Sequence, residues 1–153
     1  MTWLVVGTDA VLGVFALMFA WLWLGFRLRA VLAGAGVVVA YAISEVIKLV
    51  VQEERPCRGA PSLADCPEPG DWSFPSNHSV IAGASAVAIW ALHRTLGWVA
   101  AVCAVAAAAS RVVVGVHYVH DVVAGLLLGA LVSWVIAVLS KKRNRDVVLE
   151  RVR

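Results

Sequence analysis

The chain has 153 residues, of which 61% are hydrophobic and 15% are charged, and its formal net charge is +3. Soluble domains usually contain about 45–50% apolar and roughly 25% charged residues, so this composition excludes an ordinary soluble domain. The apolar residues form long runs between short polar clusters, and a run of roughly 18 or more can cross the ~30 Å hydrocarbon core of a bilayer as a helix. We therefore expect an all-α, polytopic transmembrane helical bundle that forms a single domain over residues 1–153.

The first apolar run ends at Phe26 and is followed by the positive residues Arg27 and Arg29, and no basic segment precedes it. A cleavable signal peptide has the opposite order, so we interpret this run as a retained first span. Further apolar segments follow along the chain. We expect about five spans, at roughly 4–26, 30–51, 77–93, 96–114 and 119–139.

A loop of roughly residues 52–75 separates the second and third spans. It contains all five prolines of the chain and half of its ten acidic residues. Proline cannot donate to a regular backbone hydrogen-bond ladder, so we expect an irregular, well-solvated loop. Cys57 and Cys66 lie within it. A disulfide between them would stabilise the loop by about 2–4 kcal/mol, and the alternative is a pair of free thiols.

Lysine and arginine gather in three clusters, after the first, third and fifth spans, which an odd number of spans places on one side of the membrane. Cytoplasmic loops carry such an excess. We therefore expect the N-terminus outside, the basic tail 140–153 in the cytoplasm, and loop 52–75 on the outer face of the plasma membrane. A topology signal also explains these charges better than a nucleic-acid site does. The clusters hold nine of the 13 basic residues: Arg27, Arg29, Arg94, Lys141, Lys142, Arg143, Arg145, Arg151 and Arg153.

Cations also collect at the outer ends of the spans, where charge near lipid is costly and usually functional. In its transition state a transferred phosphoryl group carries charge on three oxygens, and arginine and lysine donate to such oxygens. The three cations that we expect to bind phosphate are Lys48, Arg55 and Arg111. Ser76, Asn77 and His78 open a helix after Pro75, and the free amides of a helix N-terminus form an anion site. Ser76 and Asn77 therefore join the phosphate-binding set.

His117 and Asp121 are four residues apart, so on a helix they would project from one face as neighbours. A carboxylate that accepts the proton of one ring nitrogen fixes the tautomer and leaves the other nitrogen free to attack. His78 is then available to protonate the leaving alkoxide. Two histidines in these complementary roles need neither a metal nor another cofactor, and we expect none.

Three motifs in these residues resemble those of the type 2 phosphatidic acid phosphatase superfamily, the lipid phosphate phosphatases. Lys48 followed by Arg55-Pro56 looks like K-x6-R-P, and Pro75-Ser76-Asn77-His78 is similar to P-S-G-H. The stretch from Ser110-Arg111 through His117 to Asp121 matches S-R-x5-H-x3-D. Two features depart from the family: Asn77 replaces the usual glycine, and about five spans are expected where members commonly have six.

The resemblance implies that Lys48, Arg55, Arg111 and Ser76 bind phosphate. It also implies a covalent nucleophile in His117, an orienting partner in Asp121 and a general acid in His78. The expected function is metal-independent hydrolysis of a phosphomonoester or diphosphate of a membrane lipid, polyprenyl or glycerolipid, through a phosphohistidine. The polar Asn77 inclines us toward a polyprenyl substrate.

Two other functions use the same residues: transfer of the phosphoryl group to a second lipid or sugar, and non-enzymatic binding of anionic lipids. A binder needs the cations but has no use for an oriented nucleophile, so the pair of His117 and Asp121 favours an enzyme.

Simpler interpretations apply to several residues. Glu45 lies three residues before Lys48, and the two could neutralise each other. His120 is one helical step from the face of His117, so we place it at the rim. A divalent metal could bind His117, His120, Asp121 and His78, but the three nearby cations would repel it.

Overall fold

The computed structural model describes the backbone of residues 2–152 and the side chains of residues 10–142. The described chain contains no strand and is entirely helical apart from its connections. Its elements are α1 (Thr2–Val51), the 3-10 turn η1 (Pro56–Arg58), α2 (Asn77–Leu92), α3 (Arg94–Val113) and α4 (Val119–Val152). The expected all-α class is confirmed.

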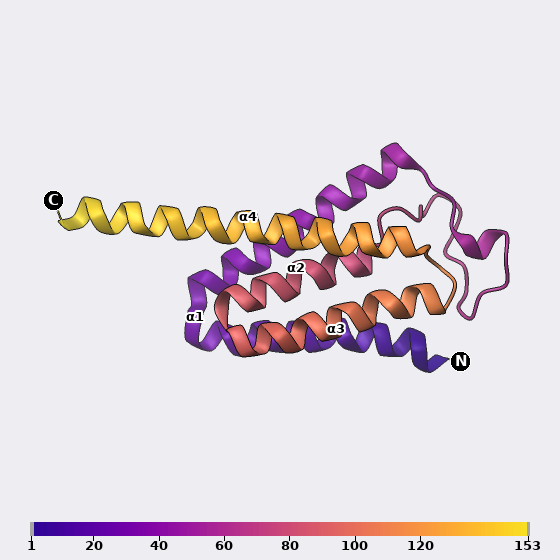
Figure 1. Cartoon of the computed structure of the whole chain (residues 1–153), viewed down its shortest axis with the longest axis horizontal. Coiled ribbons are helices and arrows are strands. Elements are labelled where there is room, and N and C mark those ends of the chain that lie inside the picture. The colour runs from indigo at the N-terminus through magenta and orange to yellow at the C-terminus, as the bar shows by residue number, and fades with distance from the viewer. Residues whose placement is uncertain (1, 153) are drawn as a thin grey trace.

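Helix α1 contains the first two expected spans, separated by a kink at Phe26, whose φ of −133° and ψ of 32° are not helical. At this kink the chain reverses its direction along the long axis of the molecule, so the two limbs of α1 form a helical hairpin (Figure 1). The break that the sequence suggested between positions 26 and 30 is therefore short. Arg27 and Arg29 are already helical, in keeping with the good helix propensity of arginine.

Within the part of the chain that the structure describes, three segments are long and apolar enough to cross a membrane: Ala10–Val51, Arg94–Val113 and Val119–Lys142. Helix α2 has 16 residues, which is about 24 Å and shorter than the ~30 Å hydrocarbon core. Many large apolar side chains on the outside of the bundle are exposed, among them Leu17, Leu24 and Val102. A soluble monomer rarely exposes so much apolar surface, so the architecture is that of a membrane-embedded bundle.

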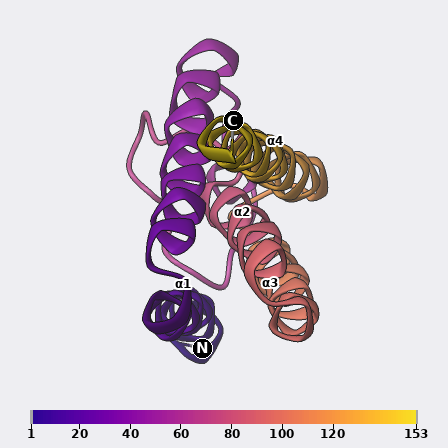
Figure 2. The same ribbon diagram turned by 90° about the vertical axis from the view of Figure 1, so that its left-hand side faces the viewer.

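Helix α2 is the centre of the bundle and packs against α1, α3 and α4 (Figure 2). Its buried face consists largely of alanine, glycine and serine, which allow helices in lipid to approach closely. Where α2 meets α4, a Cβ added to Gly83 or Gly129 would collide with the backbone of the facing helix. This close approach brings the first turns of α2 and α4 together, and the Ser76 N–H donates to the Asp121 carbonyl at 3.1 Å.

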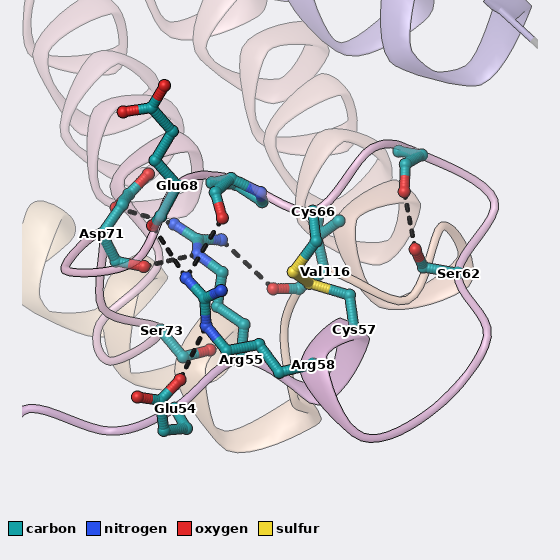
Figure 3. The surroundings of a disulfide bond; sticks show 12 residues. Glu54, Arg55, Cys57, Arg58, Ser62, Cys66, Glu68, Asp71, Ser73 and Val116 are labelled. Atoms are coloured by element: carbon teal, nitrogen blue, oxygen red, sulfur yellow. Dashed lines mark hydrogen bonds and ion pairs between the residues drawn. A yellow bond between two sulfur atoms is a disulfide. The ribbon is translucent and has the colours of Figure 1, made fainter.

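The loop between α1 and α2 lies at the end of the bundle opposite the Phe26 kink (Figure 1). Cys57 and Cys66 form a disulfide, and Arg58 donates to the carbonyls of Pro67 and Glu68 at 3.1 and 2.7 Å (Figure 3). The expectation of a well-solvated loop is wrong in one respect. Both ends of the loop turn into the protein, because Arg55 and Ser73 are buried among polar partners.

Candidate active site

His117 and Asp121 meet at the start of α4. His117 lies in the turn before the helix, where Gly115 adopts a φ of 81°, and Asp121 lies in the first helical turn. Their Nδ1 and Oδ2 atoms are 3.3 Å apart, and both side chains are buried. The pair is therefore not presented by one helical face, as the spacing had suggested. Instead Asp121 turns back over the helix start, where its Oδ2 also accepts the Tyr118 N–H at 2.9 Å.

Ser73 also contacts His117 and Asp121, and the sequence analysis did not identify it. It is fully buried, and its hydroxyl donates to Asp121 Oδ2 and lies 3.3 Å from His117 Nδ1. Its own N–H donates to the Glu53 carbonyl at 2.7 Å, which holds the end of the loop in place. The only sequence signal was its position two residues before Pro75. Ser73 thus helps to hold the carboxylate toward the imidazole.

Arg55 faces the other side of the His117 ring, with Nη1 2.9 Å from His117 Nε2. A guanidinium has no acceptor, so Nε2 must be the acceptor, and the proton of a neutral His117 is then on Nδ1, toward Asp121. Arg55 is buried, and its Nη1 also donates to the Val116 carbonyl at 3.1 Å (Figure 3). The ring is therefore held in the tautomer whose Nε2 lone pair accepts a hydrogen bond from the Arg55 guanidinium.

Asp71 joins two of the expected phosphate-binding cations. Its Oδ1 lies 2.9 Å from Arg55 Nη2, and its carbonyl accepts Arg55 Nε at 2.8 Å (Figure 3). The same Oδ1 lies 3.1 Å from Lys48 Nζ. Burial raises the pKa of Asp71, but the hydrogen bonds and positive charges of Arg55 and Lys48 outweigh burial and lower it below its usual range. The sequence had assigned Asp71 only to the acidic loop.

Glu45 contacts two of the expected site residues, Lys48 and Asn77. It lies 3.9 Å from Lys48 Nζ, farther than Asp71 does, and it accepts from Asn77 Nδ2 at 2.6 Å. Ser44 Oγ donates to the same amide group, at Asn77 Oδ1, at 2.5 Å. The Asn77 side chain is therefore engaged with α1, and both ends of its amide group already have hydrogen-bond partners there.

The remaining site residues lie around this centre. Ser76 is the N-terminal cap residue of α2, and its buried Oγ has no hydrogen-bond partner in the described part of the chain. His78 is half-buried in the first turn of α2, and Arg111 is buried in the last turn of α3. Thus the residues expected at the site come from the starts of α2 and α4, the ends of α1 and α3, and both ends of the loop.

The electrostatic surroundings of His117 favour its neutral form. Burial lowers its pKa below the ordinary value of 6.5, and the positive charges of Arg55 and Arg111 lower it further. The hydrogen bond to Asp121 acts in the opposite direction but does not compensate. A neutral imidazole keeps the lone pair on Nε2 that a nucleophile needs.

His120 is exposed and contacts the buried Asp121 carboxylate from the surface side. Its Nε2 lies 2.8 Å from Glu53 Oε1 and 3.1 Å from Asp121 Oδ1. Ligand atoms of Glu53, His120 and Asp121 all lie within 4.8 Å of one another, a spacing that a metal ion could use. Of the four residues considered for a metal from the sequence, this group contains only His120 and Asp121.

Fold and site together define a helical membrane protein with a buried, oriented histidine beside the buried cations Arg55 and Lys48. The chain belongs to the PAP2 superfamily, whose profile matches residues 29–145. The resemblance seen in the motifs is thereby confirmed.

Two relatives illustrate the similarity. Undecaprenyl-diphosphatase of Sulfolobus acidocaldarius is 37% identical over 99 residues, covering 63% of this chain and 48% of that protein. Decaprenylphosphoryl-5-phosphoribose phosphatase of Mycobacterium tuberculosis is 37% identical over 114 residues, covering 74% of this chain and 62% of that protein. The chain thus spans about half to three fifths of the length of these relatives.

A solved structure shows the same fold. The crystal structure of a transmembrane PAP2-type phosphatidylglycerolphosphate phosphatase from Bacillus subtilis matches with a TM-score of 0.72. The two chains are 23% identical, and the match covers 91% of this chain and 75% of the other.

Proposed function

We propose that this protein is a metal-independent phosphatase that hydrolyses a phosphomonoester or diphosphate of a membrane lipid through a phosphohistidine. One observation carries the proposal: His117 donates from Nδ1 toward Asp121 while its Nε2 faces the buried cation Arg55. A site that only bound anions would need the cation and not the oriented ring.

In the proposed reaction Lys48, Arg55 and Arg111 bind the non-bridging oxygens of the phosphoryl group. The buried hydroxyl of Ser76, which has no hydrogen-bond partner among the described residues, binds them too. The Nε2 lone pair of His117 attacks phosphorus, and the bond from phosphorus to the lipid oxygen breaks. His78 gives its proton to that oxygen, so the lipid leaves as an alcohol or as a monophosphate.

The second half of the reaction returns the site to its starting state. His78, now neutral, takes a proton from a water molecule that attacks the phosphohistidine. The P–N bond breaks, inorganic phosphate leaves, and Nε2 recovers its lone pair. Throughout, Asp121 holds the Nδ1 proton and stabilises the positive charge that develops on the ring.

We further propose a polyprenyl substrate. The names of the two relatives above describe enzymes that act on undecaprenyl and decaprenyl lipids. A diphosphate or a monophosphate of such a lipid carries the anionic oxygens that Lys48, Arg55 and Arg111 bind in the proposed reaction. Transfer of the phosphoryl group to a second lipid or sugar remains the alternative, because it differs only in the acceptor that replaces water.

The proposed topology has five spans, with each limb of α1 counted separately, the N-terminus outside and the C-terminus in the cytoplasm. The site then faces the outer leaflet of the plasma membrane. The loop with the Cys57–Cys66 disulfide lies at the same end, as expected for a face exposed to an oxidising environment.

The test is phosphate release by the purified protein in EDTA from phosphatidate, phosphatidylglycerophosphate, a polyprenyl monophosphate and a polyprenyl diphosphate. We expect turnover without added metal, and a phosphohistidine that can be trapped by an acid-free quench. His117→Ala should remove both without unfolding the protein. If that variant kept more than about a hundredth of the rate, His117 would not be the nucleophile, because loss of a nucleophile exceeds the 10²–10⁴-fold range of general acid–base help.

A further inference from the structure

A cavity lies at the end of the bundle far from the proposed active site. Its volume is about 970 Å³, within the range of small-molecule sites. It lies where α2 passes into α3, near the kinked end of α1 and beside the middle of α4 (Figure 1). None of its lining residues belongs to the site around His117.

Three cations from three helices line this cavity: Arg29 of α1, Arg94 of α3 and Lys141 of α4. None of them forms an ion pair with another residue whose side chain the structure describes, and no acidic residue is among the lining residues. Arg94 also occupies the first turn of α3, which contains no acidic residue. The positive end of the α3 dipole and the Arg94 guanidinium are therefore available to an anion that is not part of the protein.

The walls of the same cavity are apolar, with Leu32, Trp90, Trp134 and Ile136 among them. Ser133 also lines it, and the Ser133 hydroxyl is buried without a hydrogen-bond partner among the described residues. A small inorganic anion would use the cations and leave the walls unfilled. An uncharged lipid would use the walls and leave the cations unpaired. The complementary ligand therefore carries both an anionic headgroup and a hydrocarbon chain.

We infer that this cavity binds an anionic phospholipid from the leaflet opposite the proposed active site. The headgroup phosphate lies among Arg29, Arg94 and Lys141, and one acyl chain enters between α1, α2 and α4. Basic pockets between membrane helices suit such headgroups, and each cation near the bilayer surface contributes about fivefold to the affinity. This site stands on its own observations and does not require phosphatase activity.

The experiment measures phosphatidylglycerol retained by the purified full-length protein, by native mass spectrometry at increasing lipid concentration, with phosphatidylcholine as the uncharged comparison. The cavity variant is Arg29→Gln with Lys141→Gln. The control is Arg27→Gln with Lys142→Gln, which removes the same charge from neighbouring positions of the same two helices that do not line the cavity. We expect the cavity variant to lose at least about tenfold in apparent affinity and the control to lose less than about threefold.

Two further arms separate the possible ligands. Ala137→Trp fills the apolar part and keeps all three cations, so it should also weaken retention of the lipid. Inorganic phosphate at millimolar concentration should not displace phosphatidylglycerol from the native protein. Equal losses in the two charge variants, equal retention of both lipids, or displacement by phosphate would each overturn the inference. A cooperative thermal transition of each variant, near that of the native protein, confirms that its fold is intact.

Discussion

The carboxylate of Asp71 occupies the position that the proposed reaction assigns to phosphate oxygens. It lies between Arg55 and Lys48, at 2.9 and 3.1 Å. Both cations are buried, whereas the Asp71 side chain is 47% exposed, so its withdrawal from these cations costs little packing. A substrate must therefore displace Asp71 or share the cations with it. Such a competitor favours substrates with more negative charge, and a diphosphate displaces it better than a monophosphate.

Asp71→Asn should strengthen the binding of phosphate-like anions, because it removes the internal competitor and keeps the shape of the side chain. We expect KM for a lipid monophosphate and the inhibition constant of inorganic phosphate to fall by about three- to tenfold, the equivalent of roughly 1 kcal/mol for such a pair. Asp65→Asn, which changes an exposed acid of the same loop, is the matched control. If Asp71→Asn instead lowered kcat and left phosphate inhibition unchanged, Asp71 would be a positioning residue for Arg55 and Lys48.

The pKa of His117 predicts how the rate depends on pH. Only the neutral ring attacks, so the acid limb of kcat/KM should rise as pH increases through the pKa of His117 in the free enzyme. Because burial and the cations lower that pKa below 6.5, the acid limb of the profile should lie below pH 6.5. Asp121→Asn removes a group that raises the pKa, and the limb of its remaining activity should move to still lower pH. An acid limb at or above pH 6.5 in the native enzyme would contradict this account.

At the scale of elements, two sets of interactions hold the connection between α1 and α2 together. One is the Cys57–Cys66 disulfide and the other is the pair of bonds from Arg58 to the carbonyls of Pro67 and Glu68. They close the loop between Arg55, which faces His117, and Ser73, which contacts Asp121. Loosening the loop therefore changes the site without touching a helix.

Cys57→Ser with Cys66→Ser should destabilise the loop and weaken substrate binding more than it slows the chemical step. The stability lost is about 2–4 kcal/mol by the chain-entropy account of a closed loop. We expect a lower thermal midpoint and a KM several-fold higher, with kcat reduced less. Cys103→Ser, at the half-buried free cysteine of α3, controls for the chemical change. An unchanged KM in the double variant would show that the loop is held by Arg58 and its buried ends alone.

At the scale of the whole molecule, the catalytic and basic ends of the bundle are on opposite sides. His117, Asp121 and the disulfide loop lie at one end, and the cavity with its three cations lies at the other. Arginine and lysine at one end favour the cytoplasm for that end. The arrangement therefore predicts that a substrate reaches the site from the outer leaflet.

The sidedness is measured with a membrane-impermeant thiol reagent on intact cells that express the protein in a Cys103→Ser background. Cys57 and Cys66 should react only after reduction. In a variant that also carries Asn144→Cys and lacks the loop cysteines, the new thiol should react only after the cells are permeabilised. Labelling of position 144 in intact cells would invert the topology and move the proposed chemistry to the cytoplasmic face.

The sequence by itself determined the helical membrane class and the chemical groups of the site. Hydrophobic runs specify helices locally. The spacing of the motifs predicted a single site composed of Lys48, Arg55, His78, Arg111, His117 and Asp121. Both depend on residue type and short-range order. The family assignment, which residues 29–145 confirm, rested on the same local patterns.

Only the tertiary structure decided how these groups face one another. Ser73 contacts Asp121 across 48 positions of the chain, and Asp71 contacts Lys48 across 23. The reversal at Phe26 and the close approach of α2 to α4 create such contacts. No periodic pattern encodes them, because a hydrogen bond between distant segments depends on where the intervening chain turns. For the same reason the sequence did not predict the cavity at the other end of the bundle. Its cations Arg29, Arg94 and Lys141 lie far apart along the chain, and each was interpreted as a topology signal.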